Sequence, residues 1–221
     1  MQYFTQDFID FLKELDANNR KEWFHDNKKR YESSVKNPFL KFLQDLFAEI
    51  RKHDNQFKVE AKDCIARINR DIRFAKDKTP YNIHYTAFAS RGGKKNKHIP
   101  GIFLRFGPEE VGIMGGCYML SKEQLLSVRR QISSNIPKFR KLISATDFVA
   151  KFGEIVGEEH KRIPKEFQSA HVKEPLIAKK QFYYMAQRKP ELILSKELLS
   201  EIMSYWHTAR PVNEYFIRAI Q

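Results

Sequence analysis

The chain has 221 residues, of which 42% are hydrophobic, and its 40 Lys and Arg against 27 Asp and Glu give a formal net charge of +13. This length suffices to bury a core without disulfides, and no apolar stretch is long enough to span a bilayer, so a membrane-spanning protein is excluded. The positive charge favours anionic partners such as nucleic acid, phosphorylated metabolites or anionic lipid.

Apolar spacing predicts a helical block at residues 1–53, and the 18 Phe of the chain indicate a largely aromatic core. Thr5 is expected to cap a first helix whose apolar residues share one side. Asn19 opens a sequence that resembles a capping box and predicts a second helix. Asn37 before Pro38 predicts the start of a third helix with a regular apolar face.

Strands are predicted in the middle of the chain. Short apolar runs at residues 102–106 and 111–114 are joined by Gly-Pro-Glu-Glu, which indicates a hairpin. The sequence Tyr-Thr-Ala-Phe-Ala at residues 85–89 predicts another strand. Residues 63–74 fit either a strand or a helix, and we favour a strand to about residue 68 followed by an irregular turn.

Helices predominate again in the C-terminal part. Ser121 with Gln124 forms a capping-box pattern and predicts a helix. Residues 181–186 fit a strand or one buried turn. Ser195 is expected to cap a final helix, which Pro211 should kink or interrupt.

This order of helices, consecutive strands and helices is typical of an α+β fold. We expect a mainly antiparallel sheet of about four to five strands, packed against N- and C-terminal helices. The sequence contains no internal repeat and no long linker. We therefore predict a single domain over residues 1–221, with a helical block at 1–53, a strand-rich middle at 60–120 and a helical part at 121–221.

The N-terminal sequence and the two cysteines bear on location. The first seven residues lack the cationic head and apolar run of a secretory signal. Cys64 and Cys117 lie in apolar surroundings and form no Cys-x-x-Cys pair. We therefore expect two buried, reduced thiols in a cytoplasmic protein without membrane contact. The sequence gives no indication of the oligomeric state.

The positive charge is concentrated in one part of the chain. Residues 62–105 contain eleven Lys and Arg against three Asp, a net charge of +8, and include a polar, basic loop at 91–100 that we expect to be exposed and mobile. Arginine offers phosphate a planar fork and lysine a mobile point charge, so a cluster of both predicts an oxyanion site. The cations proposed to bind the ligand are Arg67, Arg70, Arg73, Lys76 and Lys78.

Four further positions complete the candidate site. Tyr81 would donate a hydrogen bond to the ligand, and Tyr81 or His84 would carry a proton if the protein is an enzyme. Gly115 and Gly116 would let a ligand approach the backbone, although a bulge or turn before the following helix is the more frequent reason for such glycines.

Internal pairing is the competing interpretation of the cluster, because buried charges are usually paired. It explains Arg70 and Asp71 as well as ligand contact does, since these two residues fall closest to an apolar face. For Arg73, Lys76 and Lys78, ligand contact is favoured.

No motif indicates a cofactor or a metal. The segment Gly92-Gly93-Lys94-Lys95 lacks the first glycine and the Ser or Thr of a phosphate-binding P-loop. There is no Gly-x-Ser-x-Gly elbow, and the seven histidines show no close pairing. We expect neither a metal nor a cofactor.

The segment Arg70–Tyr81 resembles the uncharacterised bacterial and fungal family called domain of unknown function 2461, and so do Asn19–Phe24, Gly115–Met119 and Pro190–Leu192. The likeness covers nearly the whole chain, although family members often carry an aromatic residue at the position of Asn69. It implies a single, soluble, intracellular α+β domain. The resemblance brings no established activity.

Two functions from different classes remain. The leading hypothesis is a binding domain for an anionic ligand, either nucleic acid or a phosphorylated small molecule. The alternative is an enzyme acting on a small anionic substrate, which Arg73 and Lys78 would orient. An enzyme needs a concave pocket on which these side chains converge, whereas nucleic-acid binding needs a broad positive strip with exposed aromatics. Few aromatic residues other than Phe74, Tyr81 and Tyr85 lie among the cations. A third interpretation makes the cluster purely architectural.

Overall fold

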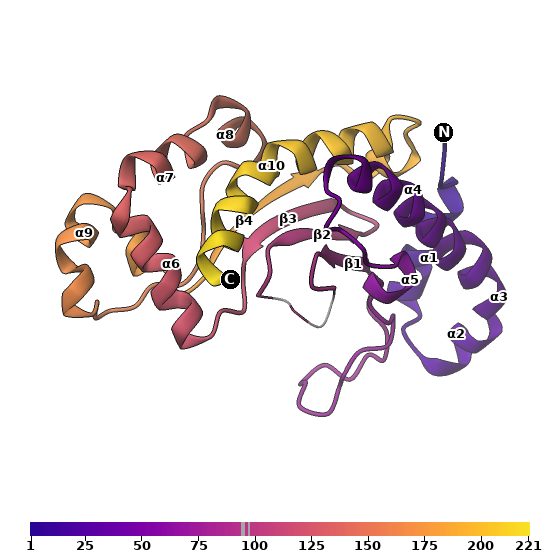
Figure 1. Cartoon of the computed structure of the whole chain (residues 1–221). Coiled ribbons are helices and arrows are strands. Elements are labelled where there is room, and N and C mark those ends of the chain that lie inside the picture. The colour runs from indigo at the N-terminus through magenta and orange to yellow at the C-terminus, as the bar shows by residue number, and fades with distance from the viewer. Residues whose placement is uncertain (94–95, 97) are drawn as a thin grey trace. The chain divides into compact units, whose positions relative to one another are not determined.

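The computed structural model describes residues 1–93, 96 and 98–221, and it has an α+β architecture (Figure 1). In the described part of the chain, four strands form one antiparallel sheet in the order β1-β2-β3-β4. These strands are β1 (Tyr85–Ser90), β2 (Gly101–Phe106), β3 (Val111–Cys117) and β4 (Phe182–Arg188). The predicted fold class is therefore confirmed. The polar segment 91–100, predicted to be exposed and mobile, includes Lys94, Lys95 and Lys97. These three lysines lie outside the described residues.

The described residues divide into two compact units. Unit 1 comprises Met1–Ala89, Phe103–Ile113 and Gln187–Met203. Unit 2 comprises Ser90–Ile102, Met114–Ala186 and Ser204–Gln221. The single domain over residues 1–221 stays a prediction.

Unit 1 begins with a series of helices (Figure 1). The helices are α1 (Gln6–Ala17), α2 (Lys21–Asp26), α3 (Lys28–Tyr31), the π-helix η1 (Glu32–Lys36), α4 (Asn37–His53) and α5 (Ala61–Cys64). Thr5 takes the N-cap position of α1, as predicted, although its side chain makes no cap hydrogen bond. The short 3-10 helix η4 (Pro190–Leu194) also belongs to unit 1.

The predicted N-cap role of Asn37 is wrong, although α4 does begin at this residue with Pro38 in its first turn. Asn37 has helical dihedral angles, and the chain remains helical from α3 through η1 into α4. Proline has no N–H to donate, and its ring crowds the carbonyl four residues earlier, which is Ser34 inside η1. The wider turn of the π-helix therefore accommodates Pro38 without ending the helix.

Phenylalanine rings build the core of unit 1. Phe39 of α4 and Phe106 of β2 meet edge to face, with ring centroids 5.3 Å apart, and Phe4 packs against both. All three side chains are buried. The aromatic core expected from the 18 Phe is thus present in this unit.

The strand favoured for residues 63–68 does not form. Ala61–Cys64 is helical, and only isolated antiparallel bridges follow, from Ile65 to Ala87 and from Asn69 to Tyr81. The chain after residue 68 is irregular, as expected.

Helices form most of unit 2. They are α6 (Lys122–Ser134), α7 (Ile136–Ile143), α8 (Thr146–Phe152), the 3-10 helix η2 (Lys165–Phe167), α9 (Gln168–Lys173) and the 3-10 helix η3 (Pro175–Ala178). The capping box at the start of α6 is confirmed, because Ser121 accepts from the Gln124 N–H and Gln124 accepts from the Ser121 N–H. Phe148 and Phe152 of α8 pack against Tyr184 of β4, with centroids 4.9 and 4.7 Å away.

The last helix, α10 (Leu198–Ile220), continues through Pro211 without interruption. Ser195 accepts a hydrogen bond from the Glu197 N–H just before α10 begins, at 3.0 Å. Residues 182–188 form strand β4, which decides between the two structures predicted there. No helix among the described residues has the length and apolar character required to cross a membrane.

Both cysteines are free and buried, as predicted. Burial raises the pKa of the Cys117 thiol well above its usual value.

Candidate functional site

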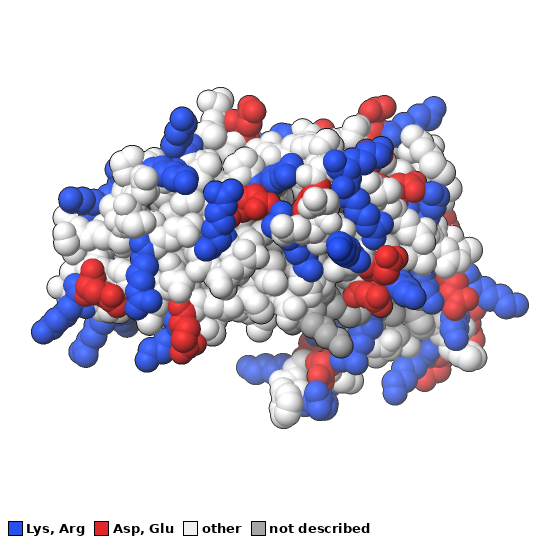
Figure 2. All heavy atoms as spheres, viewed as in Figure 1, with Lys and Arg blue, Asp and Glu red and all other residues white. Residues whose placement is uncertain are grey.

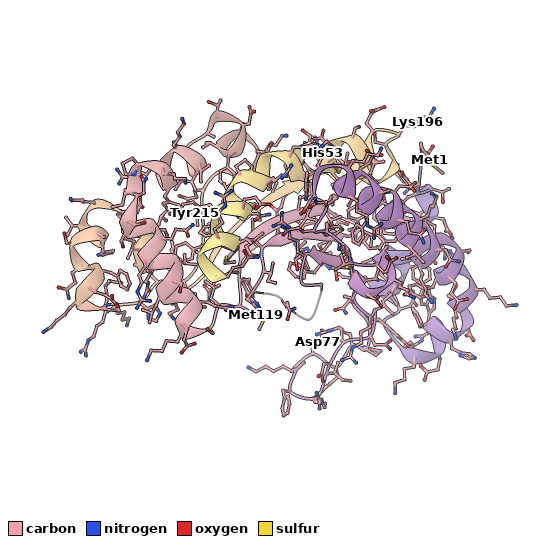
Figure 3. All side chains as sticks on the ribbon, viewed as in Figure 1. Met1, His53, Asp77, Met119, Lys196 and Tyr215 are labelled. Atoms are coloured by element: carbon pink, nitrogen blue, oxygen red, sulfur yellow. The ribbon has the colours of Figure 1, made fainter. Side chains whose placement is uncertain are left out.

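The candidate cations lie on an irregular loop of unit 1. Two chain segments run antiparallel and hold this loop through backbone hydrogen bonds, from Arg70 N–H to Pro80 O and from Asn82 N–H to Ile68 O, each 2.8 Å long. Residues 67–79, called the basic loop below, extend away from helices α1–α5 (Figure 1). In Figure 3, Asp77 marks the position of the loop.

The base of the basic loop is fastened by Asn19. Its side-chain amide donates to the Tyr81 carbonyl and accepts from the Tyr81 N–H, both at 3.0 Å. The Tyr81 ring stacks on Phe24 with centroids 4.1 Å apart and an interplanar angle of 21°. The predicted capping box at Asn19 is therefore wrong, because Arg20 occupies the N-cap position and the Asn19 amide is committed to Tyr81.

Arg70 closes the basic loop from within. Its guanidinium donates to Asp77 and to the Thr79 hydroxyl. Asp77 also accepts from the Thr79 N–H and hydroxyl, both at 2.9 Å. The Thr79 N–H, followed by Arg70, lowers the pKa of Asp77 to about 2. Arg70 thus has the internal partners that the competing interpretation requires.

Arg73 has a partner of its own. The Asp71 carboxylate accepts two hydrogen bonds from its guanidinium, at 2.9 and 2.7 Å. The same contact lowers the pKa of Asp71 and raises that of Arg73. Both side chains are exposed, so the pair lies in solvent.

The remaining cations of the loop form no hydrogen bond or contact ion pair with a carboxylate among the described residues, although Arg67 lies close enough to Asp71 to help lower the pKa of that carboxyl. Lys78 donates to the Ile72 carbonyl at 2.9 Å, which closes the loop without neutralising the ammonium group. The side chains of Arg67 and Lys76 are exposed and form no hydrogen bond or ion pair with any described residue. Figure 2 shows Lys and Arg side chains around the projecting loop.

The two candidate proton carriers are not exposed with these cations. The Tyr81 side chain is buried, and burial raises its pKa. His84 is half-buried, and its ring lies so close to Gly107 that a side chain at Gly107 would collide with it. Burial, followed by repulsion from Arg105, lowers the pKa of His84.

A shallow depression of about 610 Å³ lies beside the base of the loop. Its lining residues are Lys21, Glu22, Phe24, His25, Asp26, Lys28 and Tyr81. Of the candidate residues, only Tyr81 belongs to this lining, and two lysines are balanced there by two carboxylates. The depression therefore lacks the convergent cations that a small anionic substrate needs.

Gly115 and Gly116 belong to unit 2, within strand β3. A side chain at Gly115 would meet the Tyr184 ring, and one at Gly116, where φ is +93°, would meet the Phe182 carbonyl. The Gly116 N–H donates to Asn213, which also accepts from the Tyr184 hydroxyl. Close packing within unit 2 thus gives a structural reason for both glycines.

The structure gives Asn19 a role that the sequence pattern did not predict, as the residue that fastens the base of the loop. Its contact with Tyr81 joins two of the segments on which the family resemblance rests, so the shared motif was the available signal. As for metals, no three His, Cys, Asp or Glu side chains gather around a common point in the described part of the chain.

Comparison with known proteins gives one match. A family model described as "Conserved hypothetical protein (DUF2461)" matches residues 7–215. No curated protein and no solved structure matches the chain. Because the family model covers almost the entire sequence, the chain belongs to the conserved hypothetical proteins of the family called domain of unknown function 2461.

Proposed function

We propose that the protein binds nucleic acid through the phosphate groups, using the basic loop as its contact surface. One observation carries this proposal: five cations lie on a loop that extends away from helices α1–α5, and none of them lines the depression beside its base. Nucleic acid offers a row of phosphates to such a surface, whereas a small phosphorylated ligand needs enclosure.

The charge of unit 1 supports this location for the contact. The basic loop has five cations and two carboxylates, a net charge of +3. The rest of unit 1 contains 16 Lys and Arg against 17 Asp and Glu. Within unit 1 the loop is thus a positive feature on an almost neutral background, so it is the part of this unit that attracts a polyanion.

The internal ion pair of Arg73 does not oppose binding. Fully exposed pairs of this kind contribute little to stability, because water screens them. A phosphate group accepts the same two N–H bonds from a guanidinium as Asp71 does. Arg73 can therefore exchange its partner at little cost, and until then Asp71 holds its guanidinium in place.

The enzyme alternative has less support. It requires Tyr81 or His84 beside the cations that orient a substrate, but Tyr81 is buried against Phe24 and His84 packs at Gly107. The opposite pKa shifts of these two groups make both less suited to proton transfer near neutral pH.

A salt titration tests the proposed function. Binding of a fluorescent oligonucleotide should weaken with salt, with a logarithmic slope of up to about 3.5 if five cations each neutralise one phosphate of a single strand. Replacing the two cations without partners, in Arg67→Ala with Lys76→Ala, should lower that slope by about 1.4 and reduce affinity about tenfold.

Lys13→Ala with Lys29→Ala provides the matched control. It removes the same charge from exposed helical positions of unit 1 outside the loop, and should leave the slope and affinity almost unchanged. Undetectable binding at low salt, a salt-independent affinity, or an equal loss in both double variants would contradict the proposal.

We also propose a cytoplasmic location. Two cysteines that are both free and buried are typical of proteins kept in a reducing compartment. Fractionation of cells that express the tagged chain is the direct measurement, and recovery with an extracytoplasmic fraction would rule this location out.

A further inference from the structure

The basic loop carries an aromatic ring that the rest of the protein leaves uncovered. Phe74 is 95% exposed, whereas Phe4, Phe39 and Phe106 of the same unit are at most 1% exposed. A single exposed apolar side chain is common, but an almost fully exposed ring in the middle of a cationic loop is a ready contact for a partner with an apolar face.

The neighbours of Phe74 are cations. The Arg73 guanidinium lies 5.9 Å from the centroid of the Phe74 ring, and Lys76 follows two residues later. Contacts within the loop close it on either side of these residues, namely Lys78 with the Ile72 carbonyl and Arg70 with Asp77. A flat apolar ring is therefore presented between groups that suit phosphate.

We propose that the ligand of the basic loop is single-stranded nucleic acid, with one unpaired base stacked on Phe74 and the adjacent phosphates bound by Arg73 and Lys76. This inference rests on the function proposed above and adds the class of nucleic acid. Bases of every type have a π-face, so stacking of this kind tolerates most sequences.

Double-stranded nucleic acid fits the loop less well. Its bases are already stacked on one another, and a side chain must separate them before it can contact a base face. Proteins that insert such a wedge recover the cost by bending the duplex against a large surface. A single loop with a net charge of +3 provides no such surface.

A membrane surface is the other partner that an aromatic ring among cations can bind. Insertion of Phe74 into a bilayer would bring Asp71 and Asp77, each three residues away, against anionic headgroups. A flexible strand can place a base on the ring and leave both carboxylates in water. The carboxylates therefore favour the single strand.

The test compares three oligonucleotides of equal length: a single strand with bases, an abasic single strand with the same phosphates, and a duplex. The wild-type protein should bind the single strand with bases about 5- to 150-fold more tightly than the abasic strand, as expected for loss of one stacked base. The duplex should bind less tightly than the single strand with bases.

Three substitutions separate stacking from simple apolar contact. Phe74→Ala should abolish the preference for bases and leave the affinity for the abasic strand unchanged. Phe74→Leu keeps apolar volume without a π-face, so it should behave as Phe74→Ala does. Phe74→Trp should keep the preference, and its added fluorescence over that of the two native Trp should be quenched by the strand with bases. Because Phe74 is almost fully exposed, none of these changes disturbs the core.

Each contrary outcome has a distinct meaning. Equal affinity for the strands with and without bases, or a preference for the duplex, would reject stacking on Phe74 and leave the proposed nucleic-acid binding intact. A preference that survives in Phe74→Ala would also reject it. A blue shift of Phe74→Trp fluorescence on phosphatidylserine vesicles, with no response to any oligonucleotide, would reject both this inference and the proposed function.

Discussion

The side chain of Asn19 pairs with the backbone of Tyr81 in the way that the backbones of two neighbouring strands pair. The carboxamide offers one donor and one acceptor, and both pair with the backbone of Tyr81, 62 residues further along the chain. These bonds fix the point at which the chain leaves the basic loop. The stacked ring of Tyr81 on Phe24 fixes the same point through apolar contact. Tyr81 is thus better explained as an anchor of the loop than as a proton donor.

Asn19→Ala should therefore destabilise unit 1. It leaves the N–H and C=O of Tyr81 without their partners, which costs about 1–3 kcal/mol where water does not replace them. The measurement is chemical denaturation followed by circular dichroism. Asn18→Ala is the matched control, because the Asn18 side chain bonds only to the Glu14 carbonyl of its own helix. Equal stability of Asn19→Ala and the wild-type protein would show that the anchor lies elsewhere.

The basic loop is ordered by contacts among its own charged and polar groups. The Asp77 carboxylate accepts hydrogen bonds from the Arg70 guanidinium and from the N–H and hydroxyl of Thr79. Of these three donors, the Thr79 N–H lowers the pKa of Asp77 the most. The pKa of Asp77 in the folded protein lies below its ordinary value of 3.8. These contacts therefore stabilise the loop fully above about pH 3.8, and this contribution is lost as the pH falls through about 2.

Thr79→Val tests this account of the loop. The substitution removes the hydroxyl but keeps the backbone N–H, so the pKa of Asp77 should rise from about 2 and yet remain below 3.8. An NMR titration of the Asp77 side-chain carboxyl measures it. Thr86→Val, which alters β1 and touches no group of the Asp77 cluster, should leave the value unchanged. A full return to 3.8 in Thr79→Val would mean that the hydroxyl, and not the N–H, holds the carboxylate.

Local signals explain which elements were predictable from the sequence. The capping box from Ser121 to Gln124 spans four residues, and its pattern alone specifies the start of α6. The pattern at Asn19 failed because a partner 62 residues away competes for the amide. Asn37 before Pro38 marks the start of α4, but Asn37 is not an N-cap because the π-helix η1 already makes the preceding residues helical.

In the candidate site too, contacts between residues close in sequence were predictable, and features set by more distant contacts were not. Arg70 with Asp77 and Arg73 with Asp71 pair within a few residues, so the sequence already suggested internal pairing. The exposure of Phe74 was not predicted, because phenylalanine is usually buried and the sequence does not show on which side of an irregular loop the ring lies. Only the direction of the loop, which follows from the isolated bridges at its base, leaves the ring in solvent.

Most of the positive charge of the whole molecule lies outside unit 1. Unit 2 contains 19 Lys and Arg against 8 Asp and Glu, and unit 1 contains 21 against 19. Unit 2 therefore contributes +11 of the net +13. The net charge of the whole molecule attracts a polyanion over a distance of about one Debye length and raises the rate of association. The rate of dissociation is set by the contacts in the bound state.

The two contributions can be separated kinetically. Lys138→Gln with Lys141→Gln removes two exposed charges from α7 of unit 2, and should lower the association rate of an oligonucleotide without changing its dissociation rate. Arg67→Ala with Lys76→Ala should chiefly raise the dissociation rate, because the proposed function places these two side chains against phosphate in the bound state. Stopped-flow fluorescence at low salt measures both rates, and high salt should remove the effect of the α7 substitutions first. If the α7 variant instead dissociates as fast as the loop variant, α7 itself contacts the ligand, and the binding surface is not confined to the basic loop.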